Sequence, residues 1–236
     1  MKAIILSAGL GTRLKEITKT KPKALVEVKG VTMLERVILK LSSEGVTEFL
    51  VNIHHKGQDI IDFLIAKNHF GLNIKISDER DQLLNTGGAI LKAEDFIVGN
   101  DPILVHNVDI VSDVSINDLL EYHKSNDCIA TLCVRERYTN RYLLFDNDIN
   151  LIGWTNQKAG SFKWVGHSAE VYKKLAFSGI YLISPDFINK IKQKGEFSII
   201  DSWLDIAKIE TIKGYIDNSN VWHDLGTSER IKNAEK

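Results

Sequence analysis

The stretch Ala3-Ile4-Ile5-Leu6-Ser7-Ala8-Gly9-Leu10-Gly11-Thr12-Arg13 opens the chain with an apolar run that passes directly into two glycines, a hydroxyl residue and a cation. The apolar run predicts a buried strand. Glycines let the backbone approach a ligand closely, and the amides of such a turn point at an anion. Lys23, in Lys21-Pro22-Lys23, adds a second cation. The stretch predicts a phosphate-binding loop, with an ordinary tight turn as the alternative.

Two better-known phosphate motifs are excluded. The dinucleotide fingerprint needs a third glycine, and this chain has Arg13 near that place. A P-loop needs Gly-Lys-Ser/Thr after four intervening residues, which is also missing. The function of the loop therefore depends on the rest of the chain.

Length and composition set the broad class. The chain has 236 residues, 44% of them hydrophobic, and a net charge of -1, which suits a single globular domain over 1–236 and indicates neither a nucleic-acid partner nor membrane insertion. The apolar N-terminal run is too short for a signal peptide. Cys128 and Cys133 fall on one predicted strand with opposite orientations, so we expect reduced cysteines and a cytoplasmic protein.

Strand and helix patterns alternate through the first half of the sequence. Strands are predicted at 3–6, 48–53, 72–77 and 102–106, and helices from 32, at 58–68, 89–94 and 116–124. This order predicts an α/β fold with a mostly parallel sheet and helices on both faces. The second half reads as strands at 128–134, 142–145, 149–154 and 175–183, with helices from 184, at 198–208 and at 228–235. Residues 155–172 are polar and predict a long loop or an insertion over the site.

Two aspartates are candidate metal ligands. Asp109 follows a predicted strand in Asn107-Val108-Asp109, and ligands of open α/β sheets bind beyond the carboxyl ends of strands. Asp224 lies in Asp224-Leu225-Gly226-Thr227, where Thr227 is also a candidate cap for the last helix. Mg²⁺ prefers one or two carboxylates with phosphate oxygens. Each aspartate could equally be a cap or turn residue, and a shared site requires that the end of the chain return to the centre of the sheet.

A second glycine-containing segment, Leu83-Leu84-Asn85-Thr86-Gly87-Gly88-Ala89, leads into a predicted helix. Small residues here would let a flat base lie against the backbone. A close crossing of helix and sheet would also need glycine, and the sequence favours neither interpretation. No histidine has a partner at metal-ligand spacing, and Ser7 lacks the surroundings of a hydrolase nucleophile.

Taken in order, Ala8-Gly9-Leu10-Gly11-Thr12-Arg13-Leu14, Pro22-Lys23, Asp109 and Asp224-Leu225-Gly226-Thr227 resemble the sugar-1-phosphate nucleotidyltransferase family over essentially the whole chain. Within it, N-acetylmuramate-1-phosphate uridylyltransferases and small mannose- or heptose-1-phosphate guanylyltransferases are the most similar. The resemblance implies a Rossmann-like mostly parallel mixed sheet with helices on both faces, of the nucleotide-diphospho-sugar transferase type. It also implies a small β-rich sugar-binding portion, with residues 1–125 as the nucleotide-binding half and 126–236 as the sugar-binding and metal-completing half.

The resemblance also implies a role for each motif residue. Arg13 and Lys23 would be catalytic, and Asp109 and Asp224 would hold Mg²⁺. The nucleotide would contact Ala8, Gly9, Gly11, Thr12, Arg13, Lys23, Gly87, Gly88 and Asn107. The sugar would contact Ser178 and Gly179, with Asn156 and Lys158 near the place of the family's Glu-Lys-Pro, which is not recognisable here. Asn85 stands where the uridylyltransferases have glutamate.

The implied reaction joins a nucleoside triphosphate, UTP first and GTP next, to a sugar-1-phosphate, giving a nucleotide-sugar of the kind used in cell-envelope synthesis and pyrophosphate. Two alternatives stay open: a cytidylyltransferase for a small phospho-alcohol such as phosphocholine, and a non-catalytic nucleotide-sugar sensor. The sequence does not assign the sugar, the number of metal ions or the oligomeric state.

Overall fold

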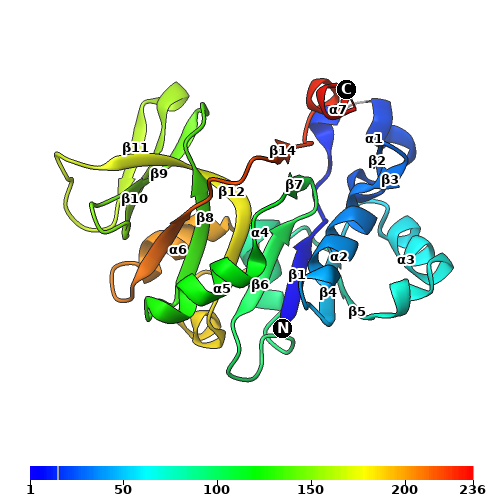
Figure 1. The fold of residues 1–236 in the computed structure, drawn as a ribbon, viewed down its shortest axis with the longest axis horizontal. Helices are drawn as coiled ribbons and strands as arrows, with labels where there is room; N and C mark the ends of the chain where they lie inside the picture. The colour runs from blue at the N-terminus through cyan, green and yellow to red at the C-terminus, as the bar shows by residue number, and fades with distance from the viewer. Residues whose placement is uncertain (15, 236) are drawn as a thin grey trace.

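The N-terminal apolar run forms strand β1, which lies inside the main sheet between β6 and β4 (Figure 1). The computed structural model describes residues 1–14 and 16–235. Within β1, Ala3 and Ile5 pack in one hydrophobic cluster and Ile4 packs in another. Successive side chains of a strand point to opposite faces, so a strand covered on both faces needs apolar residues at every position.

The main sheet has ten strands in the order β11-β10-β9-β12-β6-β1-β4-β5, with β8 pairing β12 and β13 beside it. Strands β6, β1, β4 and β5 are parallel, whereas β12 runs antiparallel to β6, β8 and β9. Two-stranded pairs are formed by β14 with β7 and by β2 with β3. The strands are β1 (Lys2–Leu6), β2 (Glu27–Val28), β3 (Val31–Thr32), β4 (Glu48–Ile53), β5 (Asn73–Asp78), β6 (Ile103–Asn107), β7 (Ile110–Ser112), β8 (Ala130–Arg135), β9 (Arg141–Phe145), β10 (Leu151–Asn156), β11 (Ser161–Trp164), β12 (Lys173–Ile183), β13 (Ile212–Ile216) and β14 (Trp222–Asp224).

Helices cover both faces of this sheet, as the sequence predicted. Buried residues of α2, α3, α5 and α7 belong to the cluster of Ala3 and Ile5, and those of α4 and α6 belong to the cluster of Ile4. The α-helices are α1 (Glu16–Thr20), α2 (Met33–Ser43), α3 (Gly57–Ala66), α4 (Asn85–Lys92), α5 (Ile116–Ser125), α6 (Ile199–Ile206) and α7 (Ser228–Ala234). The 3₁₀ turns are η1 (Thr12–Leu14), η2 (Lys23–Leu25), η3 (Asn68–Gly71), η4 (Gln157–Ala159) and η5 (Pro185–Lys190). No helix in the described part of the chain combines the length and the apolar character needed to cross a bilayer.

Several local predictions were confirmed by side-chain contacts. The helix predicted from residue 32 begins there, because the Thr32 hydroxyl caps α2 by accepting the Glu35 amide at 3.2 Å. The candidate cap Thr227 accepts the Arg230 amide at 3.4 Å at the start of α7. Both cysteines are free and buried. Cys128, however, precedes β8 rather than lying on it, so only Cys133 is a strand residue.

The prediction of a long loop or an insertion at residues 155–172 holds only for residues 165–172, which contain no helix or strand. The rest of the segment contains the end of β10, the turn η4 and strand β11, and β10 pairs antiparallel with β11. Its polar composition suits an edge strand, because three of the four residues of β11 are exposed. Strands β13, β7 and β14 were also missed, since each is short and gains its pairing from partners distant in the sequence.

The bend in β12 connects the parallel and antiparallel parts of the sheet (Figure 1). Residues 173–175 pair with β9 and residues 180–183 pair with β6, and the register against β8 shifts between Phe177 and Tyr181. Gly179 lies in this bulge with φ +85°, a conformation that side chains disfavour. A Cβ there would also lie 2.5 Å from Ile110 Cγ1 and 3.2 Å from Asn107 Nδ2. Gly179 therefore lets β12 approach the end of β6.

The buried side chain of His123 should make the free energy of unfolding depend on pH. The side chain is buried, its Nδ1 lies 2.8 Å from the Thr131 hydroxyl, and burial lowers its pKa to about 4. The unfolded chain, with a histidine pKa near 6.5, binds the extra proton below that pH, so stability is lost as the pH falls from about 6.5 towards 4. At pH 5 we expect His123 alone to account for about 2 kcal/mol of this loss.

Urea unfolding at pH 7 and pH 5 would measure this loss in the wild type and in His123→Gln. The variant should lose less stability between the two pH values, whereas His55→Gln, at an exposed position, should match the wild type. Equal losses in all three proteins would contradict the assignment.

Candidate active site

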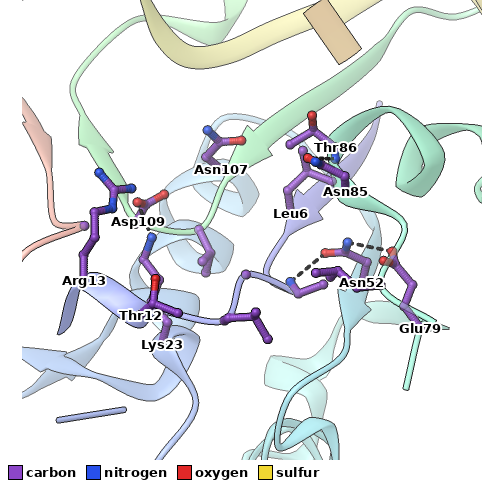
Figure 2. A pocket seen from close by; sticks show the side chains of 17 residues that line it. Leu6, Thr12, Arg13, Lys23, Asn52, Glu79, Asn85, Thr86, Asn107 and Asp109 are labelled. Carbon is purple, nitrogen blue, oxygen red and sulfur yellow. Dashed lines mark hydrogen bonds and ion pairs between the residues drawn. The ribbon is translucent and has the colours of Figure 1, made fainter. Parts of the chain in front are cut away.

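The carboxyl ends of the parallel strands border one cavity of about 420 Å³ (Figure 2). Because β1, β4, β5 and β6 are parallel, the polar residues at and after their ends meet at one edge of the sheet. The lining residues are Leu6, Ala8, Gly9, Leu10, Gly11, Thr12, Arg13, Lys23, Asn52, Glu79, Leu83, Asn85, Thr86, Asn107, Val108, Asp109 and Gly226.

The predicted phosphate loop forms one wall of this cavity. Gly11 has φ +64°, and a Cβ at this position would lie 2.7 Å from the Thr18 side chain. Both the backbone conformation and the close contact therefore require glycine. Gly9 has no atom within 4 Å of its Cβ position, so the chain is open to a ligand there. Thr12 and Arg13 follow on the short turn η1.

The two predicted metal ligands meet although 115 positions of sequence separate Asp109 from Asp224. Strand β14 pairs antiparallel with β7, and this pairing sets Asp224 opposite Ile110, the residue after Asp109. The Leu225 amide donates to the Asp109 carbonyl at 2.8 Å. The end of the chain thus returns to the centre of the sheet, which is the condition for a shared site.

Gly226 leaves an open cradle between these carboxylates. A Cβ on Gly226 would lie 2.7 Å from Asp224 Oδ1, 3.2 Å from Asp109 Oδ2 and 3.3 Å from Arg13 Nη2. Two carboxylate oxygens and a guanidinium therefore surround one point. The two carboxylates fit a divalent cation that also takes phosphate oxygens and water, whereas the guanidinium cannot ligate a metal and suits a phosphate oxygen instead.

Filling the cradle should abolish most activity without unfolding the protein. Gly226 does not have a left-handed backbone conformation, so the backbone tolerates alanine. The new methyl group would displace the Asp224 carboxylate, and we expect turnover to fall by about 10²-fold, since small displacements of reacting groups cost this much.

Pyrophosphate release and melting temperature would be compared for Gly226→Ala and His223→Ala. His223 is exposed on the other side of β14 and should tolerate alanine. Full turnover in Gly226→Ala would show that the cradle has no role.

Each of the two carboxylates is paired with a cation. Lys23 Nζ contacts Asp109 Oδ2, with side chains 12% and 13% exposed, and Arg230 Nη1 contacts Asp224 Oδ2. Arg13, Lys23 and Asp109 lie together on one side of the view in Figure 2. Sequence reasoning did not identify Arg230 as a partner of Asp224. The one available signal was its position on the first turn of α7, shortly after the Asp224 motif.

The opposite side of the cavity contains Asn85 and Thr86, from the second glycine-containing segment, together with Asn52 and Glu79, which sequence reasoning did not single out. Asn85 has φ +60°, and its Oδ1 accepts the Thr86 amide at 2.7 Å. The Thr86 hydroxyl accepts the Ile199 amide at 3.1 Å, so α6 supports this wall.

Gly87 and Gly88 occupy a different environment from the one predicted. They lie within α4, which begins at Asn85, and both are buried. A Cβ on Gly87 would lie 2.2 Å from the Phe197 ring, and one on Gly88 would lie 2.2 Å from the Gly195 carbonyl oxygen. The two glycines therefore allow α4 to pack closely against the loop before α6, rather than against the sheet as the alternative interpretation expected, and the cavity is lined by Leu83, Asn85 and Thr86 instead.

None of the four predicted sugar-binding residues lines the cavity. Ser178 is fully buried, and Gly179 packs beside Asn107, which itself lines the cavity. Asn156 and Lys158 lie at the end of β10 and in η4, where the Asn156 side chain accepts the Ala159 amide at 3.4 Å. They therefore belong to the edge of the sheet, where β10 and β11 form a hairpin.

The histidines near the sheet edge do not form a metal centre. Burial lowers the pKa of His106 to about 4, so its ring is neutral at pH 7. His54 Nδ1 lies 2.6 Å from the Glu79 carbonyl. Among the residues that the structure describes, no three histidine, cysteine or acidic side chains gather into a metal cluster.

The sheet and its cavity define an α/β protein of the nucleotide-diphospho-sugar transferase fold. The chain belongs to the nucleotidyl transferase family, whose model matches residues 2–236. It is 40% identical to an N-acetylmuramate alpha-1-phosphate uridylyltransferase from Caulobacter vibrioides, over 99% of this chain and 95% of that protein.

Other similarities are more distant. A mannose-1-phosphate guanyltransferase from Yarrowia lipolytica is 27% identical over 96% of this chain, which spans 61% of that longer protein. The crystal structure of HddC from Yersinia pseudotuberculosis in complex with GMP-PN superimposes with a TM-score of 0.79 at 23% identity, covering 99% of this chain and 97% of that one. The similarity to HddC supports the assignment of the fold.

Proposed function

We propose that this chain transfers a nucleotidyl group from a nucleoside triphosphate to a sugar-1-phosphate, releasing pyrophosphate. The observation that supports this most strongly is the convergence of Asp109, Asp224 and Arg13 on one point beside the glycine loop. Carboxylates and cations at the mouth of such a loop suit a triphosphate and a divalent cation. The relatives at 40% and 27% identity are named as enzymes of this reaction class.

The chain's own residues would act by positioning and by charge. The amides after Gly9 would hold the triphosphate, and Arg13 would face its developing negative charge. Lys23, now paired with Asp109, would contact the α-phosphate and the attacking sugar phosphate. Because that nucleophile is already anionic, the reaction needs no protein base.

Mg²⁺ would be held by Asp109 and Asp224, and the bound ion would neutralise charge on the transferring phosphate and the pyrophosphate. The open point beside Gly226 supports this assignment, because the two carboxylates face it with no side chain between them.

For the base we propose UTP first and GTP next, since the 40% identical relative is a uridylyltransferase and the relative from Yarrowia lipolytica is a guanyltransferase. The Leu83–Thr86 segment is the proposed base-binding wall, in place of Gly87 and Gly88. The half of the chain from 126 onwards would hold the acceptor sugar beside Gly179 and Asn107. Two buried, free cysteines support a reducing compartment such as the cytoplasm.

Pyrophosphate release should be measured for the four nucleoside triphosphates, each with a panel of sugar-1-phosphates and with phosphocholine. Turnover with UTP and one sugar-1-phosphate is expected. Turnover with CTP and phosphocholine alone would identify a cytidylyltransferase, and binding without turnover for any pair would identify a sensor.

A further inference from the structure

A buried carboxylate links the two walls of the cavity. Glu79 follows β5 and is 1% exposed. One of its carboxyl oxygens accepts from Asn52 Nδ2 at 2.8 Å, and the other accepts the Leu84 amide at 3.2 Å. The backbone of Glu79 is fixed as well, because its amide donates to the Ile53 carbonyl at 2.8 Å.

Asn52 continues this link to the glycine loop. Its side chain, at the end of β4, accepts the Ser7 amide at 2.6 Å and the Ala8 amide at 3.2 Å through Oδ1. The Ser7 hydroxyl also contacts the Asn52 carbonyl. Two amide donors converge on Oδ1, so the orientation of the side-chain amide is determined and Nδ2 must face Glu79. Figure 2 shows this connection between the loop, Asn52 and Glu79.

The far end of the network lies in the proposed base-binding wall. Leu84 directly precedes Asn85, and its neighbours Leu83, Asn85 and Thr86 line the cavity. Glu79 and Asn52 also line the cavity, but their carboxyl and amide atoms are each engaged by protein groups. They therefore act on a ligand through the two segments that they join.

We propose that Glu79 and Asn52 are positioning residues that set the spacing between the glycine loop and the Leu83–Thr86 wall, and thereby decide which base fits while the triphosphate is bound. The inference rests on the proposed nucleotidyl transfer. A buried carboxylate is costly and a sheet does not require one, whereas two loops at the edge of a sheet need a rigid polar connection to hold a ligand precisely.

The hydrogen-bond chemistry of the pair allows a decisive test. Glu79→Gln replaces one acceptor with an NH₂ group, so either Asn52 Nδ2 or the Leu84 amide faces a donor. Asn52→Asp places one carboxylate against another. In the double variant Glu79→Gln/Asn52→Asp the polarity is reversed, and every bond can form again. The introduced aspartate accepts from both loop amides and from the introduced glutamine, whose carbonyl oxygen accepts the Leu84 amide.

We expect each single variant to lower kcat/KM for the preferred nucleoside triphosphate by about 10- to 100-fold, mainly through KM, and to reduce its preference over the next base. The double variant should recover to within about threefold of the wild type in both respects. Asp217→Asn, at a buried carboxyl that pairs with Arg135 where β13 lies beside β8, should leave the base preference unchanged.

Calorimetric titration with each of the four nucleoside triphosphates, in the presence of Mg²⁺, measures the same preference without turnover. It separates this proposal from the proposed function, because a wild type that binds selectively but releases no pyrophosphate refutes only the latter. The positioning role is overturned if the double variant is no better than the product of the two single effects. It is also overturned if the single variants lower affinity equally for all four nucleotides. If a single variant does not fold, the double variant still tests the positioning role. Recovery of the wild-type base preference supports the role, and loss of that preference contradicts it.

Discussion

Replacing Asp109 with asparagine is expected to lower the turnover of nucleotidyl transfer by about 10³-fold, because a divalent cation at a transferring phosphate contributes several kcal/mol to the barrier. Asparagine keeps the size and one acceptor oxygen of Asp109 but removes the charge that faces the point beside Gly226. It also leaves Lys23 without its ion-pair partner in a part of the cavity where both side chains are mostly covered.

The measurement is pyrophosphate release over a range of Mg²⁺ concentrations at saturating substrates. Asp109→Asn should need more Mg²⁺ and reach a lower maximum. Asp62→Asn, at an exposed position on α3, serves as the control and should match the wild type. Turnover in Asp109→Asn above a tenth of the wild-type value would contradict the proposed role of Asp109 in binding Mg²⁺.

Replacing Lys23 with methionine is expected to lower turnover by about 10²- to 10³-fold, the range seen when one stabilising group at a developing charge is removed. Lys23 begins the short turn η2 after Pro22, and its ammonium contacts Asp109 on the same side of the cavity. Methionine retains the apolar stem, so packing against Gly11, whose Cβ position lies 3.3 Å from Lys23 Cβ, is preserved.

Lys21→Met is the matched control, since Lys21 lies two positions earlier and pairs with Glu27 at 3.5 Å on the surface. Both variants should melt within a few degrees of the wild type, while only Lys23→Met loses turnover. A role confined to the ion pair with Asp109 would instead lower the melting temperature of Lys23→Met and spare kcat.

The predicted layers of the fold were largely confirmed because their signals are local. The apolar run of β1, the spacing of buried residues on α2 and the caps Thr32 and Thr227 each act within a few residues of sequence. Strand β11 was misread as part of a loop because an exposed strand carries the polar composition of a loop, whereas the half-buried strand β10 was predicted at 149–154.

The site likewise contains some residues that local sequence indicated and others that only tertiary contacts identify. Asp109 and Asp224 were selected from the sequence as chemically suitable, yet only the pairing of β14 with β7 brings them to one point. The sequence could not reveal Glu79 and Asn52, because a buried acid in an ordinary strand-loop segment resembles a surface acid until its partners are known.

Local composition therefore decided the order of strands and helices, the glycine loop and the kinds of charged groups available for chemistry. These features depend on backbone preferences and on apolar spacing, which neighbouring residues determine. Tertiary structure alone decided that Gly87 and Gly88 pack against the 195–197 segment, that Gly226 leaves an open point between two carboxylates, and that Asn52 and Glu79 join the two walls. Each of these depends on residues brought together by strand pairing across large distances in the sequence, which no local pattern records.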